Sequence, residues 1–309
     1  MSPRVLTAFF VLSGSLSAAL VSDVRAAIGA NDFARAESLI QAQRKHSGVT
    51  PEVILATSWL GRGALAQKNL DKAEQYALET RKLALAELNK RSLDAEKDLP
   101  LALGASIEVQ GHVLAQRGQT SEAVRFLNTE LKRYYSTSIR TRIQKNIHLL
   151  SLEGKPAPAI DTSVYLGPKP LPIASLKGKP LILFFWAHWC GDCKQQAPVL
   201  ARLANEFGPQ GLIIIGPTQR YGYVAGGEEA PPLKETPYID SVRKGFYGTL
   251  PMTVPVSEEN FRRYGCSTTP TLALVDRQGI VRLYHPGRMT YEELLPRVQA
   301  IMEKSESSD

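Results

Sequence analysis

Apolar and polar residues alternate along the first half of the chain with the period of an α-helix. In FARAESLIQAQRK (33–45), LDKAEQYALETRKLALAEL (70–88) and TSEAVRFLNTELKRYY (120–135), apolar residues recur three and four positions apart, and charged residues fill the remaining faces. No strand-like alternation interrupts this pattern before about residue 152. The sequence therefore predicts an all-helical N-terminal domain over residues 20–152.

Within this helical region a weak repeat places small residues at equivalent positions. Gly61 is followed twelve residues later by Ala73, and Gly111 is followed twelve residues later by Ala123. Small residues at such points allow paired helices to approach closely, so residues 20–152 resemble about three degenerate tetratricopeptide-type repeats. Two interpretations of this domain stay open: a concave surface that docks a partner protein, or an ordinary helical bundle without a ligand.

The helical pattern breaks at SLEGKPAPAIDT (151–162), which contains one glycine and two prolines. Short apolar runs and helical segments alternate after it. The predicted strands are 181–186, 212–216, 253–257, 271–276 and 280–285, and the predicted helices are about 191–207, 237–246, 258–265 and 290–303.

Strands separated by helices pair in parallel through crossovers, whereas the last two strands, joined by a tight turn at 277–279, form an antiparallel edge. Residues 153–304 are therefore predicted to form an α/β domain, in which a mixed sheet lies between two layers of helices. We expect residues 305–309 to be a disordered tail.

The composition argues against several classes of protein. The chain has 309 residues, too many for one ordinary compact domain. Its net charge of +7 is spread along the chain without a basic block, so nucleic-acid binding is not expected. Three cysteines are too few for the disulfide framework of a small secreted scaffold. Cysteine in this protein is therefore either incidental or used for chemistry.

The N-terminus has the layout of a secretory signal peptide. Arg4 precedes an apolar stretch that extends to about Leu20, and Ser17–Ala19 offers a cleavage site. We expect residues 1–19 to be removed. The alternative is an uncleaved membrane anchor, although the apolar stretch is short for a span of about 20 residues. In both cases the remaining chain would lie in the periplasm or another extracytoplasmic compartment, where thiols can be oxidised.

Cys190 and Cys193 stand in the motif WAHWCGDCK (186–194), directly after the apolar run PLILFF. This order places Cys190 at the end of a buried strand and Cys193 about one turn into the following helix. A thiolate at a helix N-terminus is stabilised by unpaired backbone N–H groups and by the helix dipole, so it can attack at neutral pH. One thiol can then attack a disulfide while the other stays within reach to resolve the mixed disulfide.

The strand, the motif WAHWCGDCK, the following helix and a later STTPT before another strand together resemble the thioredoxin fold. The segments GKPAP, LKGKPLILFFWA and LVDRQGIVR resemble the TlpA/ResA branch of extracytoplasmic thiol-disulfide oxidoreductases, over about residues 154–303. The resemblance implies electron exchange with protein disulfides through a redox-active disulfide, without a metal or an organic cofactor. It also implies protein thiol or disulfide clients and an upstream electron donor.

The same resemblance assigns roles to individual residues. Cys190 matches the nucleophile and Cys193 the resolving thiol, with Gly191 as a supporting residue after the nucleophile. Thr269–Pro270 matches the family's cis-proline, where the preceding backbone pairs with a bound substrate strand, although most X–Pro bonds are trans and a trans bond stays open here. Trp189 would either cover the disulfide as a flat apolar wall or pack against the helix.

The motif also departs from the family pattern. Asp192 stands where many relatives have proline, and a carboxylate at this point should raise the pKa of the Cys190 thiol. Phe184 and Gln196 occupy two positions that carry a proton acceptor in relatives. His188 could serve as an acid or base because its ordinary pKa is near neutral, but we expect it to lie exposed beside the site.

Cys266 stands four residues before Pro270, and we expect it to be a small buried apolar residue; the alternative is a third thiol that exchanges with the redox pair. A zinc site needs four ligands, and three cysteines with scattered histidines do not supply a metal motif. His46, His112 and His148 lie far apart in the helical region, where we expect solvated helix surfaces. No metal site is therefore predicted.

Two other functions stay open. A thiol peroxidase of the peroxiredoxin type shares the fold, but its signature has threonine or serine three residues before a lone cysteine, and this chain has Ala187 there. A docking scaffold would rely on the helical domain and keep a vestigial redox site. The segment Pro217–Asp240 is longer than an ordinary strand-to-helix connection. It either rims the site and helps to select a partner, or is an insertion without a contact role.

Overall fold

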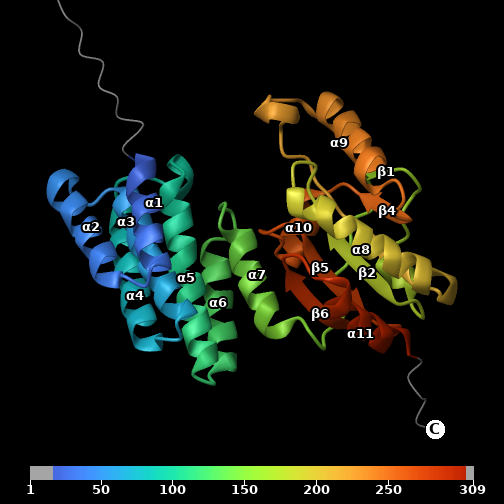
Figure 1. The fold of residues 1–309 in the computed structure, drawn as a ribbon, viewed down its shortest axis with the longest axis horizontal. Coiled ribbons are helices and arrows are strands. Elements are labelled where there is room, and N and C mark those ends of the chain that lie inside the picture. The colour runs from blue at the N-terminus through green and yellow to red at the C-terminus, as the bar shows by residue number, and fades with distance from the viewer. Residues whose placement is uncertain (1–16, 304–309) are drawn as a thin grey trace, which may run out of the picture. The chain divides into compact units, whose positions relative to one another are not determined.

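The computed structural model describes residues 17–303, which divide into two compact units (Figure 1). The first unit extends to Phe126 and includes Thr137–Ile139, and the second contains Leu127–Ser136 and the chain from Arg140 onward. The predicted tail lies outside the described residues, and so does the predicted signal peptide apart from its last three residues. Among the described helices, none is long and apolar enough to span a membrane.

The N-terminal region is helical, as its periodicity predicts. Its elements are α1 (Ser17–Gly29), α2 (Phe33–Ser47), α3 (Pro51–Ala66), α4 (Leu70–Glu87), the 3-10 turn η1 (Leu93–Ala95), α5 (Asp98–Gln116), α6 (Thr120–Arg133) and α7 (Arg140–Ser151). Polar cap residues start several of these helices: the side chains of Asp32, Thr50 and Asn69 each accept a hydrogen bond from a backbone N–H three residues ahead.

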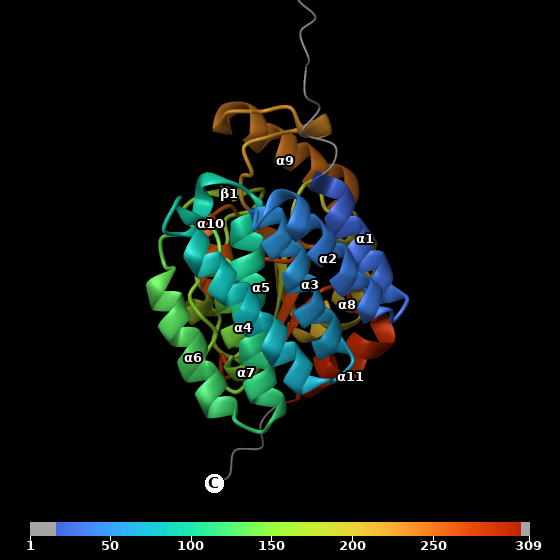
Figure 2. The ribbon, with the colours of Figure 1, turned by 90° about the vertical axis from the view of Figure 1, so that its left-hand side faces the viewer.

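Helices α1 to α5 pack against one another in the first unit, and Figure 2 shows α3, α4 and α5 side by side. The repeat residue Gly61 lies in α3 against α4. A Cβ atom at this position would lie 3.5 Å from the backbone nitrogen of Ala77 and 3.6 Å from the carbonyl oxygen of Ala73, so a side chain larger than alanine would meet the backbone of α4. This copy of the repeat therefore marks a close helix pair, while the tetratricopeptide-like nature of the domain stays a prediction.

The second unit is built on a six-stranded mixed sheet in the order β1-β4-β3-β2-β5-β6. Its strands are β1 (Tyr165–Leu166), β2 (Leu181–Phe185), β3 (Ile213–Ile215), β4 (Met252–Pro255), β5 (Thr271–Val275) and β6 (Val281–Pro286). β3 pairs in parallel with β2 and β4, whereas β5 pairs antiparallel with β2 and β6. The five predicted strands and the antiparallel edge are confirmed. β1 is absent from the prediction because two residues are too few for an alternation pattern.

Helices cover both faces of this sheet. They are α8 (Gly191–Phe207), α9 (Pro232–Tyr247), α10 (Glu258–Tyr264) and α11 (Tyr291–Met302), with the 3-10 turns η2 (Ile173–Leu176), η3 (Gly208–Gln210) and η4 (Ala225–Gly227). All five residues of β2 are buried. Ile182 and Phe184 pack in the apolar cluster with α8, α9 and α11, whereas Leu181 and Leu183 pack in the cluster with α10. β2 is thus the central strand of a thioredoxin fold.

Helix α9 begins earlier than predicted. The helix predicted to begin at about residue 237 begins at Pro232, so the last third of the segment Pro217–Asp240 is helical. Proline suits the first position of a helix, because an N–H group there would have no acceptor within the helix. We call the loop that remains, residues 217–231, the insertion loop.

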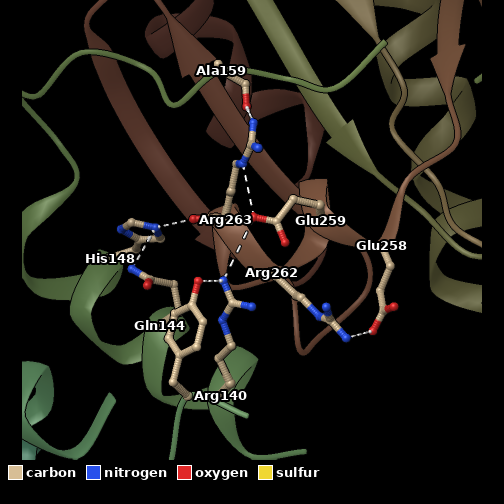
Figure 3. A network of polar contacts seen from close by, with 9 residues as sticks. Arg140, Gln144, His148, Ala159, Glu258, Glu259, Arg262 and Arg263 are labelled. Atoms are coloured by element: carbon tan, nitrogen blue, oxygen red, sulfur yellow. Dashed lines mark hydrogen bonds and ion pairs between the residues drawn. The ribbon is translucent and has the colours of Figure 1, made fainter. Parts of the chain in front are cut away.

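Helix α7 belongs to the second unit, although its sequence pattern groups it with the preceding helices. A ring nitrogen of His148 lies 2.7 Å from the carbonyl oxygen of Arg263, and the Arg140 guanidinium lies 3.9 Å from the Glu259 carboxylate (Figure 3). The predicted boundary at residue 152 therefore marks the change from helices to strands, whereas the compact unit already includes α7. His148 contacts α10 instead of lying on a solvated helix surface.

Candidate redox active site

Cys190 and Cys193 are joined by a disulfide at the start of α8, with their Cα atoms 5.3 Å apart. Cys190 follows the end of β2 and is the N-cap residue of α8, and its sulfur accepts a hydrogen bond from the backbone N–H of Cys193 at 3.0 Å. The predicted positions of both cysteines, at the end of the strand and in the first turn of the helix, are confirmed. Their sulfur atoms lie at the positive end of the helix dipole, where a thiolate is stabilised.

The two cysteines differ in their access to solvent. Cys190 is 3 % exposed, whereas Cys193 is completely buried. Both cysteines are thus buried in the oxidised protein, and Cys190 is the less enclosed of the two. Gly191, which separates the two, has no neighbouring atom within 4 Å of a Cβ built on it, so this edge of the site is open.

A tight turn leads into the first cysteine. The backbone N–H of Cys190 donates to the carbonyl of Ala187 at 3.1 Å, and His188 and Trp189 are the two residues inside this turn. The His188 side chain is buried in the protein, whereas the Trp189 side chain lies at the surface: His188 is 1 % exposed and Trp189 is 50 % exposed. The expectation that His188 lies exposed beside the site is wrong.

His188 is enclosed by the insertion loop and α9. Its ring lies edge-on to the rings of Tyr221, Tyr223 and Tyr238, with centroids 5.3–5.5 Å away. Its Nε2 atom lies 3.4 Å from a carboxylate oxygen of Glu235. Burial lowers the pKa of His188 below its ordinary value of 6.5, and the neighbouring Glu235 carboxylate opposes that shift.

Glu235 is a buried carboxylate that sequence reasoning missed. It is 1 % exposed, and its two oxygens accept hydrogen bonds from the backbone N–H groups of Tyr221 and Gly222 at 2.5 and 2.9 Å. Tyr221 in turn packs edge-on against Trp189, with centroids 5.5 Å apart. The insertion loop thus contacts the cysteine turn through Tyr221 and Tyr223, while its part in selecting a partner stays a prediction.

Asp192 faces solvent and forms an ion pair that the sequence does not reveal. Its carboxylate lies 3.4 Å from the Arg288 guanidinium, and both side chains are about half exposed. Arg288 comes from the segment between β6 and α11. Its positive charge offsets the effect that the Asp192 carboxylate alone would have on a thiolate at Cys190.

The Thr269–Pro270 peptide bond is cis, as the resemblance implies. It directly precedes β5, and Thr271, the first residue of β5, pairs with Phe185 at the end of β2. The cis-proline segment therefore lies at the same end of the sheet as the cysteine turn.

Cys266 is separated from the redox pair. It is buried in the apolar cluster on the α10 face of the sheet, whereas Cys190 and Cys193 belong to the cluster on the other face. Burial raises the pKa of the Cys266 thiol well above its ordinary range. Both observations agree with the expected role of a small buried apolar residue.

Neither of the two positions that carry a proton acceptor in relatives has a carboxylate here. Phe184 packs its ring against Tyr247, and Gln196 is buried, with its side-chain oxygen accepting from the backbone N–H of Met289 at 2.9 Å. Glu235 supplies a buried carboxylate to the cysteine turn from a different part of the chain. Within residues 17–303, no group of three or more histidine, cysteine, aspartate or glutamate side chains is arranged to hold a metal ion.

Comparisons with known proteins agree with this geometry. Residues 154–222 match the AhpC/TSA family model. The chain is 32% identical over 162 residues to the thiol:disulfide interchange protein DsbE of Pseudomonas aeruginosa, which covers 51% of this chain and 81% of that protein. It is 25% identical over 140 residues to the thiol-disulfide oxidoreductase ResA of Bacillus subtilis, which covers 45% of this chain and 70% of that protein.

Among solved structures, a crystal structure described as a putative thiol:disulfide interchange protein DsbE from Chlorobium tepidum is 24% identical; the match covers 49% of this chain and 98% of that one, with a TM-score of 0.38. The identity to the Pseudomonas protein over most of its length, together with the cysteine pair at the start of α8, identifies the second unit. Through that unit, the chain belongs to the DsbE/ResA family of thiol-disulfide oxidoreductases.

Proposed function

We propose that this protein is exported and exchanges electrons between its Cys190–Cys193 pair and the disulfides of protein clients. The observation that carries the proposal is the disulfide itself: at the N-terminus of α8 it joins Cys190, which is 3 % exposed, to Cys193, which is completely buried. Such a pair can form a mixed disulfide through the less enclosed Cys190, and it keeps the Cys193 sulfur in reach to resolve it.

In the reducing direction, the Cys190 thiolate attacks one sulfur of a client disulfide. The client S–S bond breaks, a mixed disulfide forms, and the other client sulfur leaves as a thiolate that takes up a proton. The Cys193 thiol then loses its proton and attacks the Cys190 sulfur, which releases the second client thiol and forms the Cys190–Cys193 disulfide. Two electrons pass to the client, and an upstream dithiol donor must supply them to reduce the pair again.

The surroundings support this chemistry. The dipole of α8 and the N–H of Cys193 stabilise negative charge on the Cys190 sulfur. By the family pattern the backbone before Pro270 would pair with a client strand, and Trp189, which is half exposed, would offer the client an apolar face. Because the two thiols carry both electrons, the exchange needs neither a metal nor an organic cofactor.

The extracytoplasmic location rests on the N-terminal sequence. The basic residue, the apolar stretch and the small residues at 17–19 favour export, with cleavage or with retention as an anchor. Fractionation of cells that express the full chain, with size analysis of the product, distinguishes cleavage of the N-terminal segment from its retention as an anchor. A client partner on the helical domain belongs to the same proposal, since paired helices of this kind present extended surfaces.

The test is a trapped intermediate. A Cys193→Ser variant should accumulate a mixed disulfide with clients in cells, whereas Cys190→Ser should accumulate none. Equilibration of the purified wild-type protein in glutathione or dithiothreitol redox buffers then gives the direction of transfer. A midpoint below about −230 mV would indicate a reductase, and one above about −180 mV an oxidant or isomerase. Absence of a reversible disulfide, with unchanged cellular behaviour of Cys190→Ser, would favour a docking scaffold.

A further inference from the structure

His188, inside the cysteine turn, and Glu235 of α9 form a buried pair that the proposed exchange reaction does not use. Both side chains are 1 % exposed, and their polar atoms approach to 3.4 Å. Burial of two ionisable side chains is costly unless they are held by polar partners. Their position beside the redox pair therefore calls for a role.

Glu235 joins two segments that are far apart in the sequence. One of its oxygens accepts from the N–H of Tyr221 and the other from the N–H of Gly222, while the first also lies next to the ring of His188. A carboxylate can accept at both oxygens at once, whereas an amide has only one acceptor oxygen. The site therefore distinguishes glutamate from glutamine, although the two have nearly the same shape.

The two segments that Glu235 joins both lead to Trp189. His188 precedes Trp189 within the turn closed by the Cys190 N–H, so anchoring the His188 ring restricts the turn. Tyr221, whose N–H is held by Glu235, packs its ring against the ring of Trp189. Trp189 is therefore fixed from the side of its own backbone and from the side of its ring, while half of its surface stays open.

We propose that Glu235 is a positioning residue for client recognition: through His188 and Tyr221 it holds Trp189 as a rigid apolar platform beside the Cys190–Cys193 pair. The inference rests on the proposed function, because a platform matters only if protein clients bind there. A fixed aromatic face binds a client segment without first losing its own conformational freedom, which favours affinity. Cys190 is held separately by α8, so the platform affects client binding and not the sulfur chemistry.

The experiment compares exchange with a large and a small disulfide. The pre-reduced full chain is mixed with excess insulin, a disulfide-bonded model protein, or with oxidised glutathione, and single-turnover rates are measured over a range of concentrations. Glu235→Gln should raise the half-saturating insulin concentration about three- to tenfold through the loss of one buried acceptor. Its maximal rate and its rate with glutathione should change less than about twofold, because α8 still holds Cys190.

Glu229→Gln is the matched control, because Glu229 is an exposed carboxylate of the same insertion loop and should leave both reactions unchanged. Hydrogen exchange of the Tyr221 and Gly222 amides reports the anchor directly and should be faster in Glu235→Gln. Faster exchange with an unchanged half-saturating insulin concentration would overturn the proposal, since the anchor would then be structural only. Equal losses with insulin and glutathione would overturn it as well, because the chemistry would be affected.

A second variant keeps the test independent of folding. Tyr221→Ala removes the ring that contacts Trp189 and leaves the Glu235 carboxylate in place, so it should also weaken insulin exchange and spare glutathione exchange. If Glu235→Gln does not fold, unchanged insulin kinetics in Tyr221→Ala overturn the proposal. Failure of the proposed function has a different signature: the wild-type protein itself would exchange with glutathione but not with insulin.

Discussion

Replacing Gly265 by alanine should destabilise the second unit, because two separate constraints require glycine at this position. Gly265 follows α10 in the left-handed conformation, with φ 63° and ψ 33°, and the next N–H, that of Cys266, returns to the carbonyl of Phe261 and closes the helix. A Cβ atom on Gly265 would also lie 2.3 Å from the nitrogen of Lys145 and 2.7 Å from the carbonyl carbon of Gln144. Both atoms belong to the backbone of α7, so no side chain can rotate away to make room.

The two constraints have separate magnitudes. The left-handed conformation costs alanine about 1 kcal/mol more than glycine. Displacing the backbone of a packed helix costs a further 1–3 kcal/mol or so. We therefore expect the free energy of unfolding to fall by about 2–4 kcal/mol in Gly265→Ala. The matched control is Gly279→Ala: its φ of 81° is also positive, but a Cβ there has no neighbour within 4 Å, so only the conformational cost of about 1 kcal/mol applies.

Urea denaturation of the oxidised full chain measures the difference, provided that the signal comes from the second unit alone. Trp59 lies in the first unit, and Trp186 and Trp189 lie in the second. A Trp59→Phe background therefore makes tryptophan fluorescence a reporter of the second unit, since the two units need not unfold together. Equal losses of stability in the two glycine variants would refute the contact between α7 and the end of α10.

Three further predictions follow from the site and from α7. A fragment of residues 140–303 should be more stable than one of residues 153–303 by about 3–6 kcal/mol in urea, because α7 contributes two buried isoleucines; equal midpoints would contradict this. Arg288→Ala should raise the pKa of the Cys190 thiol and slow its alkylation at pH 7 about twofold, because the Asp192 carboxylate then lacks its positive partner. A faster reaction would contradict this prediction. His188 has a lowered pKa in the folded protein, so the unfolded chain binds more protons below about pH 6.5. The free energy of unfolding should therefore have its full value above that pH and fall as the pH decreases. The slope of this free energy against pH should be smaller in His188→Phe, by up to about 1.4 kcal/mol per pH unit, as urea midpoints from pH 7 to 5 would show.

The parts of the fold that sequence predicts well are those in which local pattern and burial coincide. β2 is an uninterrupted apolar run because it is buried on both faces, and a strand of this kind needs no partner to be recognised. Helix α8 begins at Gly191, where Cys190 provides the cap, and ends at Phe207, in agreement with its periodicity. The placement of the cysteine pair depends only on these two elements, and it is correspondingly confirmed.

The assignment of α7 could not be predicted from such patterns. The apolar residues Ile143 and Ile147 recur at helical spacing, which shows that α7 has a buried face but not what covers it. The answer depends on α10, more than a hundred residues further along, where Gly265 lets the two backbones meet. A change of secondary structure along a chain is therefore a weaker guide to a domain boundary than the contacts of the last helix before it.

The burial of His188 and the exposure of Trp189 show a second limit of prediction from sequence. The two residues are adjacent inside a turn, where neither helical nor strand periodicity decides which side chain is buried. An imidazole is ordinarily the more polar of the two, and so the better candidate for solvent. The order is reversed because the insertion loop supplies the rings of Tyr221 and Tyr223, and α9 supplies the Tyr238 ring and the Glu235 carboxylate around His188. Since Trp189 is thereby left at the surface, the insertion loop and α9 together determine which residue next to Cys190 is exposed.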